Sequence, residues 1–194
     1  MTFTPTKLTL ADYLAYHDGT DRRYELVDGV LQPMSQPSGR HGAISEFLND
    51  EFRTEIRRLG RDWVAKQGLI GVEIPRLGDA ATVRIPDVSV VTLSQWQSLY
   101  NREAVLTDSA PLLVVEVVSS SSLSEDYRRK RVEYNTVEIP EYWIVDAIAD
   151  PRITLFTLVE GLYEVEILRG SDRIPSRLFS ELDLTVERVL QANS

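Results

Sequence analysis

The residues best suited to chemistry are two acids set within apolar stretches. Glu116 lies in LLVVEVVSSSS (residues 112–122), and Asp87 lies in RIPDVSVV (84–91). Valine-rich runs are typical of buried strands, and an ionised carboxylate is costly there unless its charge is compensated. Two such carboxylates close together raise that cost, which a divalent cation would offset. Hard oxygen ligands favour magnesium or manganese.

A cation held by Asp87 and Glu116 could activate water and neutralise the negative charge that develops on a phosphodiester. Lys130, in EDYRRKRVEY (125–134), could stabilise the transition state or orient the attacking water. Asp126, Lys130 and Tyr134 are spaced by four, so they would share one face of a helix. A phosphodiester substrate therefore makes chemical sense.

Each candidate also has a simpler interpretation. Glu25, in RYELVDG (23–29), could be an ordinary exposed strand residue. Asp87 could cap a turn, and Glu116 could pair with an arginine for structural reasons. Lys130 could be a solvated lysine, and His41 could be a surface or helix-capping residue rather than a ligand or proton carrier.

Several other catalytic classes lack their motifs. The serines at 119–122 are not part of a Gly-x-Ser-x-Gly elbow, and they are better explained as a loop and helix cap. The chain contains neither a Gly-x-x-x-x-Gly-Lys-Ser/Thr phosphate loop nor a zinc-binding spacing. With no cysteine, it can form neither disulfides nor thiolate metal sites.

Composition limits the possible partners. The 194 residues include 21 basic and 30 acidic side chains, giving a net charge of −9, which argues against coating nucleic acid through bulk positive charge. A local basic groove remains possible, because basic residues cluster at Arg22–Arg23, at Arg57, Arg58 and Arg61, and at Arg128–Arg131. We find no signal-peptide pattern and no apolar run near the roughly 20 residues of a membrane helix, so we expect a cytoplasmic protein.

The remaining patterns predict the elements that must position these residues. Asp28-Gly29 and Glu160-Gly161 each lie between strand-like runs and predict hairpins. Helical spacing of apolar residues predicts a long helix over 42–59, ended by Gly60. Further helices are expected at 10–18, 93–100, 124–135 and near the end of the chain, and further strands at 63–66, 69–74, 84–91, around Glu116 and at 141–146. The result is one α/β or α+β domain over residues 1–194, with a mixed central sheet flanked by helices.

Five segments in this order resemble a known family: RYELVDG, RIPDVSVV, LLVVEVVSSSS, DYRRKRVEY and EYWIVD. The chain resembles the Uma-two family of restriction-endonuclease-like proteins, within the PD-(D/E)XK nuclease superfamily, from about residue 8 to 190. The resemblance implies a restriction-endonuclease-like fold and a metal-dependent endonuclease acting on DNA. It implies Asp87 and Glu116 as metal carboxylates, Glu25 as an assisting upstream acid, and His41 as the histidine before the long helix.

One position departs from the superfamily pattern. A lysine is expected two residues after the second acid, where this chain has Val118. The family pattern places a lysine at Lys130 on the next helix. Arg128 and Arg129 beside it could guide a phosphate backbone, and restriction-type nucleases imply a homodimer. The alternative is a non-cleaving module that keeps the fold and binds metal or nucleic acid.

Overall fold

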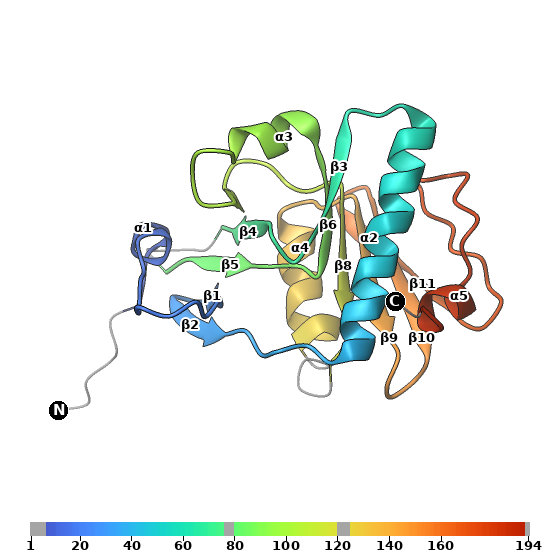
Figure 1. Ribbon diagram of the computed structural model, residues 1–194, viewed down its shortest axis with the longest axis horizontal. Helices are drawn as coiled ribbons and strands as arrows, with labels where there is room; N and C mark the ends of the chain where they lie inside the picture. Colours follow the sequence, from blue (N-terminus) through green and yellow to red (C-terminus); the bar gives the residue numbers. More distant parts are fainter. Residues whose placement is uncertain (1–6, 76–79, 120–124, 193–194) are drawn as a thin grey trace.

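The computed structural model describes residues 7–75, 80–119 and 125–192 (Figure 1). The helices within these ranges are α1 (Leu10–Leu14), α2 (Gly39–Leu59), α3 (Leu93–Ser98), the π-helix η1 (Glu125–Lys130), α4 (Arg131–Thr136) and α5 (Val186–Leu190). One sheet contains β1 (Tyr24–Val27), β2 (Val30–Pro33), β4 (Gly71–Ile74), β5 (Thr82–Arg84) and β7 (Val105–Leu106). The other contains β3 (Trp63–Gln67), β6 (Val88–Thr92), β8 (Leu113–Val117), β9 (Glu141–Asp146), β10 (Arg152–Val159) and β11 (Leu162–Leu168).

The two sheets are both mixed. Their strand orders are β2-β1-β5-β4-β7 and β11-β10-β9-β8-β6-β3. The pairs β4–β7 and β8–β9 are parallel, and the other pairs are antiparallel. The expected α+β class with mixed sheet and flanking helices is confirmed, although the strands form two sheets instead of one. Among the described residues, no helix is long and apolar enough to cross a membrane.

Helix α2 covers one face of the six-stranded sheet (Figure 1). The Ser38 hydroxyl accepts a hydrogen bond from the His41 amide at its start, and Gly60 ends it in the left-handed region at φ 60°. Its buried apolar residues recur at helical spacing and pack against β6, β8 and β9; they include Ile44, Leu48, Phe52 and Ile56. The predicted long helix is thus confirmed, with its start at Gly39.

The opposite face of this sheet supports the helix that carries Lys130. Side chains alternate along β8, so Val115 and Val117 join the core beneath α2, whereas Val114 and Val118 pack with Tyr134 of α4. Glu116 therefore faces η1 and α4. In Figure 1 these helical segments lie on the far side of the sheet from α2.

The segment RIPDVSVV differs from its prediction as one strand. It is divided into the end of β5, which ends at Arg84, and β6, which begins at Val88, and these strands belong to different sheets. Pro86 in the connection has no amide hydrogen for a sheet ladder. Asp87 consequently lies just before a buried strand and not inside one.

The predictions of hairpins and of a helix cap are confirmed. Both hairpins are present, with positive φ values at Asp28 and Gly29 and at Glu160 and Gly161. The capping box at Thr9 is present, but α1 ends at Leu14 rather than near residue 18. The charged helix expected over 124–135 is a π-helix that continues into α4. The loop and cap predicted at residues 120–122 lie outside the described residues, as does residue 124, the predicted start of the charged helix.

Candidate active site

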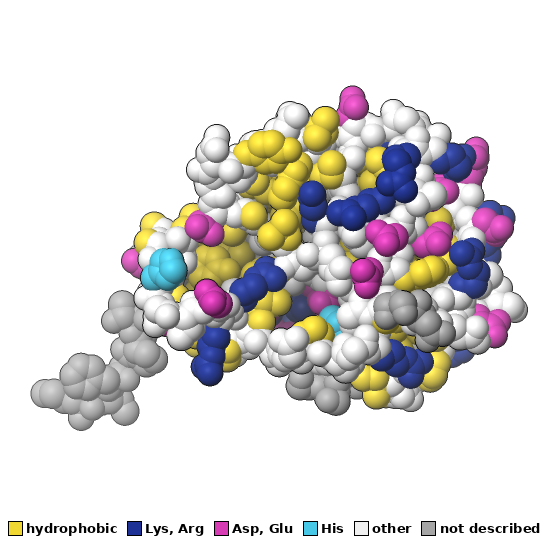
Figure 2. All heavy atoms as spheres, in the orientation of Figure 1, with side chains coloured by type: hydrophobic (Ala, Val, Ile, Leu, Met, Phe, Trp, Pro, Cys, Tyr) yellow, Lys and Arg dark blue, Asp and Glu magenta, His cyan; other side chains and the backbone are white. Residues whose placement is uncertain are grey.

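The candidate residues meet at the carboxyl end of β8. Val88 pairs with Val115 across the antiparallel strands β6 and β8, so Asp87 and Glu116 occupy the next pair of opposed positions. Opposed residues of an antiparallel pair share a face, and the two carboxyl groups are therefore neighbours. Figure 2 shows a hollow near the middle of the visible face, in which acidic, basic and histidine side chains gather.

Asp87 is fixed by the elements on either side of it. Its Oδ2 accepts a hydrogen bond of 2.7 Å from the Val117 amide and lies 3.1 Å from Nε2 of His41. Burial of the imidazole opposes protonation, but the Asp87 carboxylate and a backbone hydrogen bond with Val117 outweigh it and raise the pKa of His41. His41 reaches this place because it lies in the first turn of α2.

Glu116 is 3% exposed and has a partner on each oxygen. The Tyr134 hydroxyl donates to Oε1 at 2.5 Å, and Nζ of Lys130 lies 2.8 Å from Oε2. Burial raises the pKa of Glu116 to about 8; the Lys130 charge opposes this effect, whereas Asp87 and other nearby acids add to it. The expectation of a buried acid among valines is thus met, and its partner is a lysine, not an arginine.

Lys130 is surrounded by carboxylates. Besides Glu116, its Nζ lies 3.2 Å from Oδ1 of Asp126 and 4.0 Å from Oε1 of Glu25. Burial alone would lower the pKa of Lys130, but these acids raise it above its ordinary value, so the amine is charged at neutral pH. The interpretation of Lys130 as a solvated lysine is wrong, because the residue is only 7% exposed.

Glu25 faces the same cluster from β1. Its Oε2 accepts from Nη1 of Arg84 at 2.9 Å, and its Oε1 accepts from the Ile85 amide at 2.9 Å. The side chain is 14% exposed, so the interpretation as an ordinary exposed strand residue is also wrong. Both oxygens are engaged by groups at the end of β5.

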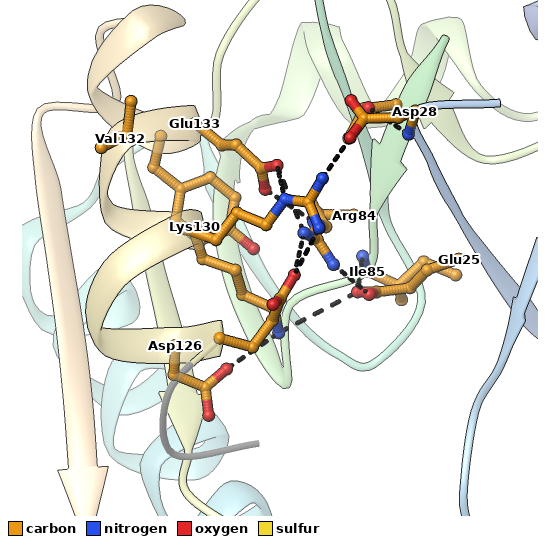
Figure 3. Close-up of polar contacts among 12 residues, drawn as sticks. Glu25, Asp28, Arg84, Ile85, Asp126, Lys130, Val132 and Glu133 are labelled. Atoms are coloured by element: carbon orange, nitrogen blue, oxygen red, sulfur yellow. Dashed lines mark hydrogen bonds and ion pairs between the residues drawn. The ribbon is translucent and has the colours of Figure 1, made fainter. Parts of the chain in front are cut away.

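Arg84 is a member of this cluster that the sequence analysis missed. It is 2% exposed, and its guanidinium contacts three acids, as Figure 3 shows in part. Nε lies 2.6 Å from Oε2 of Glu133, while Nη2 lies 3.2 Å from Oε1 of Glu133 and 2.5 Å from Oε1 of Glu125. The available signal was an arginine next to the apolar run that contains Asp87.

The two arginines expected to bind nucleic acid are placed differently. Arg128 is exposed. Arg129 forms an ion pair with Asp28, and its Nε lies 3.5 Å from Oε1 of Glu133. Arg128 is therefore the better placed of the two to meet a phosphate backbone.

The chemistry of the donor set fits a divalent cation. Asp87 and Glu116 supply hard oxygen atoms, and magnesium is often bound through one or two carboxylates together with water. Burial raises the pKa of Glu116 and the neighbouring acids add to this effect, and a bound cation would favour the ionised carboxylate instead. Within the described ranges, no group of three or more His, Asp or Glu side chains is arranged to hold a metal ion.

The chain is similar to known proteins in both sequence and structure. A family model, Uma2, described as "Putative restriction endonuclease", matches residues 10–187. The crystal structure of "a putative nuclease belonging to DUF820" from Anabaena variabilis superposes with a TM-score of 0.75 and 20% sequence identity, covering 94% of this chain and 97% of that one. At this identity the likeness demonstrates a shared fold. No curated protein matches the chain.

Proposed function

The chain belongs to the Uma2 family of restriction-endonuclease-like proteins, as the sequence resemblance predicted, and from this premise we propose that it is a divalent-metal-dependent endonuclease acting on DNA. The observation that carries this proposal is the cluster of Asp87, Glu116 and Lys130 at the end of β8. Opposed acids beside a charged, buried lysine suit the hydrolysis of a phosphodiester.

Asp87 and Glu116 are the residues that would hold Mg²⁺ or Mn²⁺. When bound, such a cation supplies an activated water and neutralises charge on the phosphate. Lys130, which stays protonated, is placed to offset the negative charge of the transition state. His41 holds Asp87, and Tyr134 holds Glu116, so each carboxylate is oriented by a neighbour.

Asp126 and Glu25 assist from the other side of the lysine. Asp126 orients the amine of Lys130 at 3.2 Å, and Glu25 adds negative charge at 4.0 Å. Arg128, and Arg129 more weakly because of its acidic partners, would contact the phosphate backbone of the substrate. The partners are thus DNA and a divalent cation.

A second candidate is a non-cleaving module that binds metal or nucleic acid. Two observations favour it: the net charge of −9 and the engagement of Arg129 by acids. Both reduce the attraction of the surface for a polyanion.

The cleavage test uses purified protein, supercoiled DNA and single-stranded DNA or RNA, with Mg²⁺ or Mn²⁺ and with EDTA. We expect cleavage with either metal and none with EDTA. Asp87→Ala, Glu116→Ala and Lys130→Ala should remain folded and lose cleavage. Glu181→Ala, which removes an exposed acid paired with Arg58, is the matched control and should remain active.

If wild-type protein binds nucleic acid, and neither it nor Lys130→Ala cuts any DNA or RNA in either metal, the non-cleaving module becomes the better description.

The same proposal includes a cytoplasmic homodimer, because restriction-type nucleases commonly cut two strands with two subunits and symmetric pairs are the commonest oligomer. Light scattering over a range of concentrations tests the dimer. A monomer at the highest concentration would contradict it.

A further inference from the structure

Arg84 lies where β5 of the five-stranded sheet meets the helical segment that carries Lys130 (Figure 3). We propose that Arg84 is a positioning residue, which fixes Lys130 over Glu116 and, together with Glu25, fixes the segment that leads to Asp87. This role deepens the nuclease function proposed above and rests on it. Arg84 itself contacts none of the residues assigned to the metal.

The guanidinium of Arg84 spans the helical segment that carries Lys130. Arg84 contacts Glu125, the first residue of η1, and Glu133, on α4. Lys130 lies between these two acids in the chain. Arginine can do this because its planar fork presents five N–H donors, whereas a lysine ammonium is a compact point charge. One side chain of β5 therefore ties the helical segment on both sides of Lys130.

The helical segment before α4 has an unusual geometry. Glu125–Lys130 is π-helical, a form that is rare, occurs mostly as single turns and is frequent at functional sites. Contacts from outside the helix can support such a turn. Arg84 provides such contacts at Glu125, at one end of the π-helical segment, and at Glu133, just beyond Lys130.

Glu25 connects Arg84 with the segment that leads to Asp87. Glu25 binds Arg84 with one oxygen and the Ile85 amide with the other. It thereby fixes both the arginine and the backbone two residues before Asp87. A displacement of Arg84 would thus reach both the acid on one side of the site and the lysine on the other.

Arg84 also balances the negative charge of the acids around it. Arg84 is almost fully buried and is the shared partner of Glu25, Glu125 and Glu133. Removal of the guanidinium would take from these three acids a cation at 2.5–2.9 Å, and the loss is most unfavourable at Glu133, which is 1% exposed. Arg129 contacts two of them only at 3.5 and 3.8 Å. We therefore expect η1 to shift toward water when Arg84 is replaced, carrying Lys130 away from Glu116.

A first experiment measures this shift without measuring activity. The chain has only three lysines, Lys7, Lys66 and Lys130, so acetylation by acetic anhydride can be followed at each one by mass spectrometry. In metal-free wild-type protein, Lys130 should react much more slowly than Lys7. In Arg84→Met we expect Lys130 to react at least tenfold faster, with Lys66 unchanged.

The matched control is Arg58→Met. Arg58 also contacts two glutamates, Glu55 and Glu181, but it lies on the outer surface of α2. The Arg58→Met variant should leave the reactivity of Lys130 unchanged. Glu133→Gln is a milder second variant in case Arg84→Met does not fold, and it should also accelerate acetylation of Lys130. Unchanged protection of Lys130 in either folded site variant would overturn the proposal.

A second experiment separates positioning from simple stability. Arg84→Lys keeps the charge and loses the fork, so kcat for DNA cleavage should fall about thirtyfold with KM unchanged, because Lys130 acts in the transition state. The comparison is Leu182→Ala, a change in the core beneath α2, assayed where both variants are fully folded. This core variant should retain kcat.

The outcomes also separate this role from the proposed function. A wild-type protein that cuts nothing removes the nuclease function, whereas the acetylation rates still report whether Arg84 holds Lys130 in place. Wild-type kcat in Arg84→Lys, or loss of Lys130 protection with no change in kcat, would overturn the positioning role.

Discussion

Glu116 has an ionisation that differs strongly between the folded and unfolded chain. Burial raises its pKa from 4.5 to about 8. Between these values the folded protein binds a proton that the unfolded chain has released, so the free energy of unfolding falls as pH rises through this window. His41, whose pKa is also raised, acts in the same direction above pH 6.5.

We therefore expect wild-type protein in metal-free buffer to lose stability between pH 5 and pH 8, by roughly 1 to 4 kcal/mol. Glu116→Gln removes the titrating group and should flatten most of this dependence. Urea unfolding at a series of pH values measures it. Glu181→Gln, at an exposed acid, should follow the wild-type curve; a Glu116→Gln curve parallel to wild type would contradict the assignment.

Metal binding at the same residues should be visible as a change in stability. A cation that binds only the folded protein adds about 2.7 kcal/mol when its concentration is 100 times Kd. Mg²⁺ or Mn²⁺ should raise Tm more at pH 8 than at pH 6, because the cation must displace the proton from Glu116. Asp87→Asn should abolish the shift and EDTA should reverse it. A Tm independent of both metals would count against the site.

The sequence alone indicated Asp87, Glu116 and Lys130 as candidates, which the structure brings together, but it gave no indication of Arg84. A carboxylate flanked by valines is visible in one segment, because period-two alternation and burial are local properties. The partners of Arg84 come from β1, η1 and α4, which only the folded chain brings together. The simpler interpretations of Glu25 and Lys130 as exposed residues failed for the same reason.

At the scale of the elements, the η1–α4 segment sets the direction of Lys130. Tyr134 and Glu133 are buried and fix α4 from one side. Insertion of one alanine after Arg131 would rotate Lys130 by about 100° relative to these anchors. We expect loss of cleavage, faster acetylation of Lys130 and a loss of roughly 1 to 3 kcal/mol in stability.

Val132→Ala is the control for this insertion, because Val132 is 63% exposed and its replacement keeps the helical register. It should retain cleavage and the protection of Lys130. An active insertion variant would show that α4 does not set the lysine's position.

The sequence predicted those elements whose signals are local. Asp28-Gly29 and Glu160-Gly161 adopt the positive φ values that a tight hairpin needs, and Gly60 ends α2 in the left-handed region. The division of RIPDVSVV depends instead on which sheet each half joins. Likewise, nothing in EDYRRKRVEY specifies a π-helix, and its contacts with Arg84 of β5 form only in the folded chain.

At the scale of the whole molecule, nucleic-acid binding must overcome a net charge of −9. Each phosphate neutralised by a basic side chain contributes about 0.9 to the slope of log K against log salt concentration. An acidic protein with a local contact should therefore bind with a small slope, set by few residues. Arg128 is an exposed basic residue two positions before Lys130.

Arg128→Ala should accordingly weaken DNA binding at all sequences and reduce the salt slope by about 1, while kcat at saturating DNA changes little. Fluorescence anisotropy in a potassium chloride series measures the slope, with EDTA present so that the DNA stays intact. Arg173→Ala is the matched control, because Arg173 is exposed and lies in the carboxyl-terminal part of the chain. It should leave the slope unchanged. Equal slopes for wild type and Arg128→Ala would place the phosphate contacts on another surface, since a side chain that neutralises a phosphate cannot be removed without releasing fewer counterions.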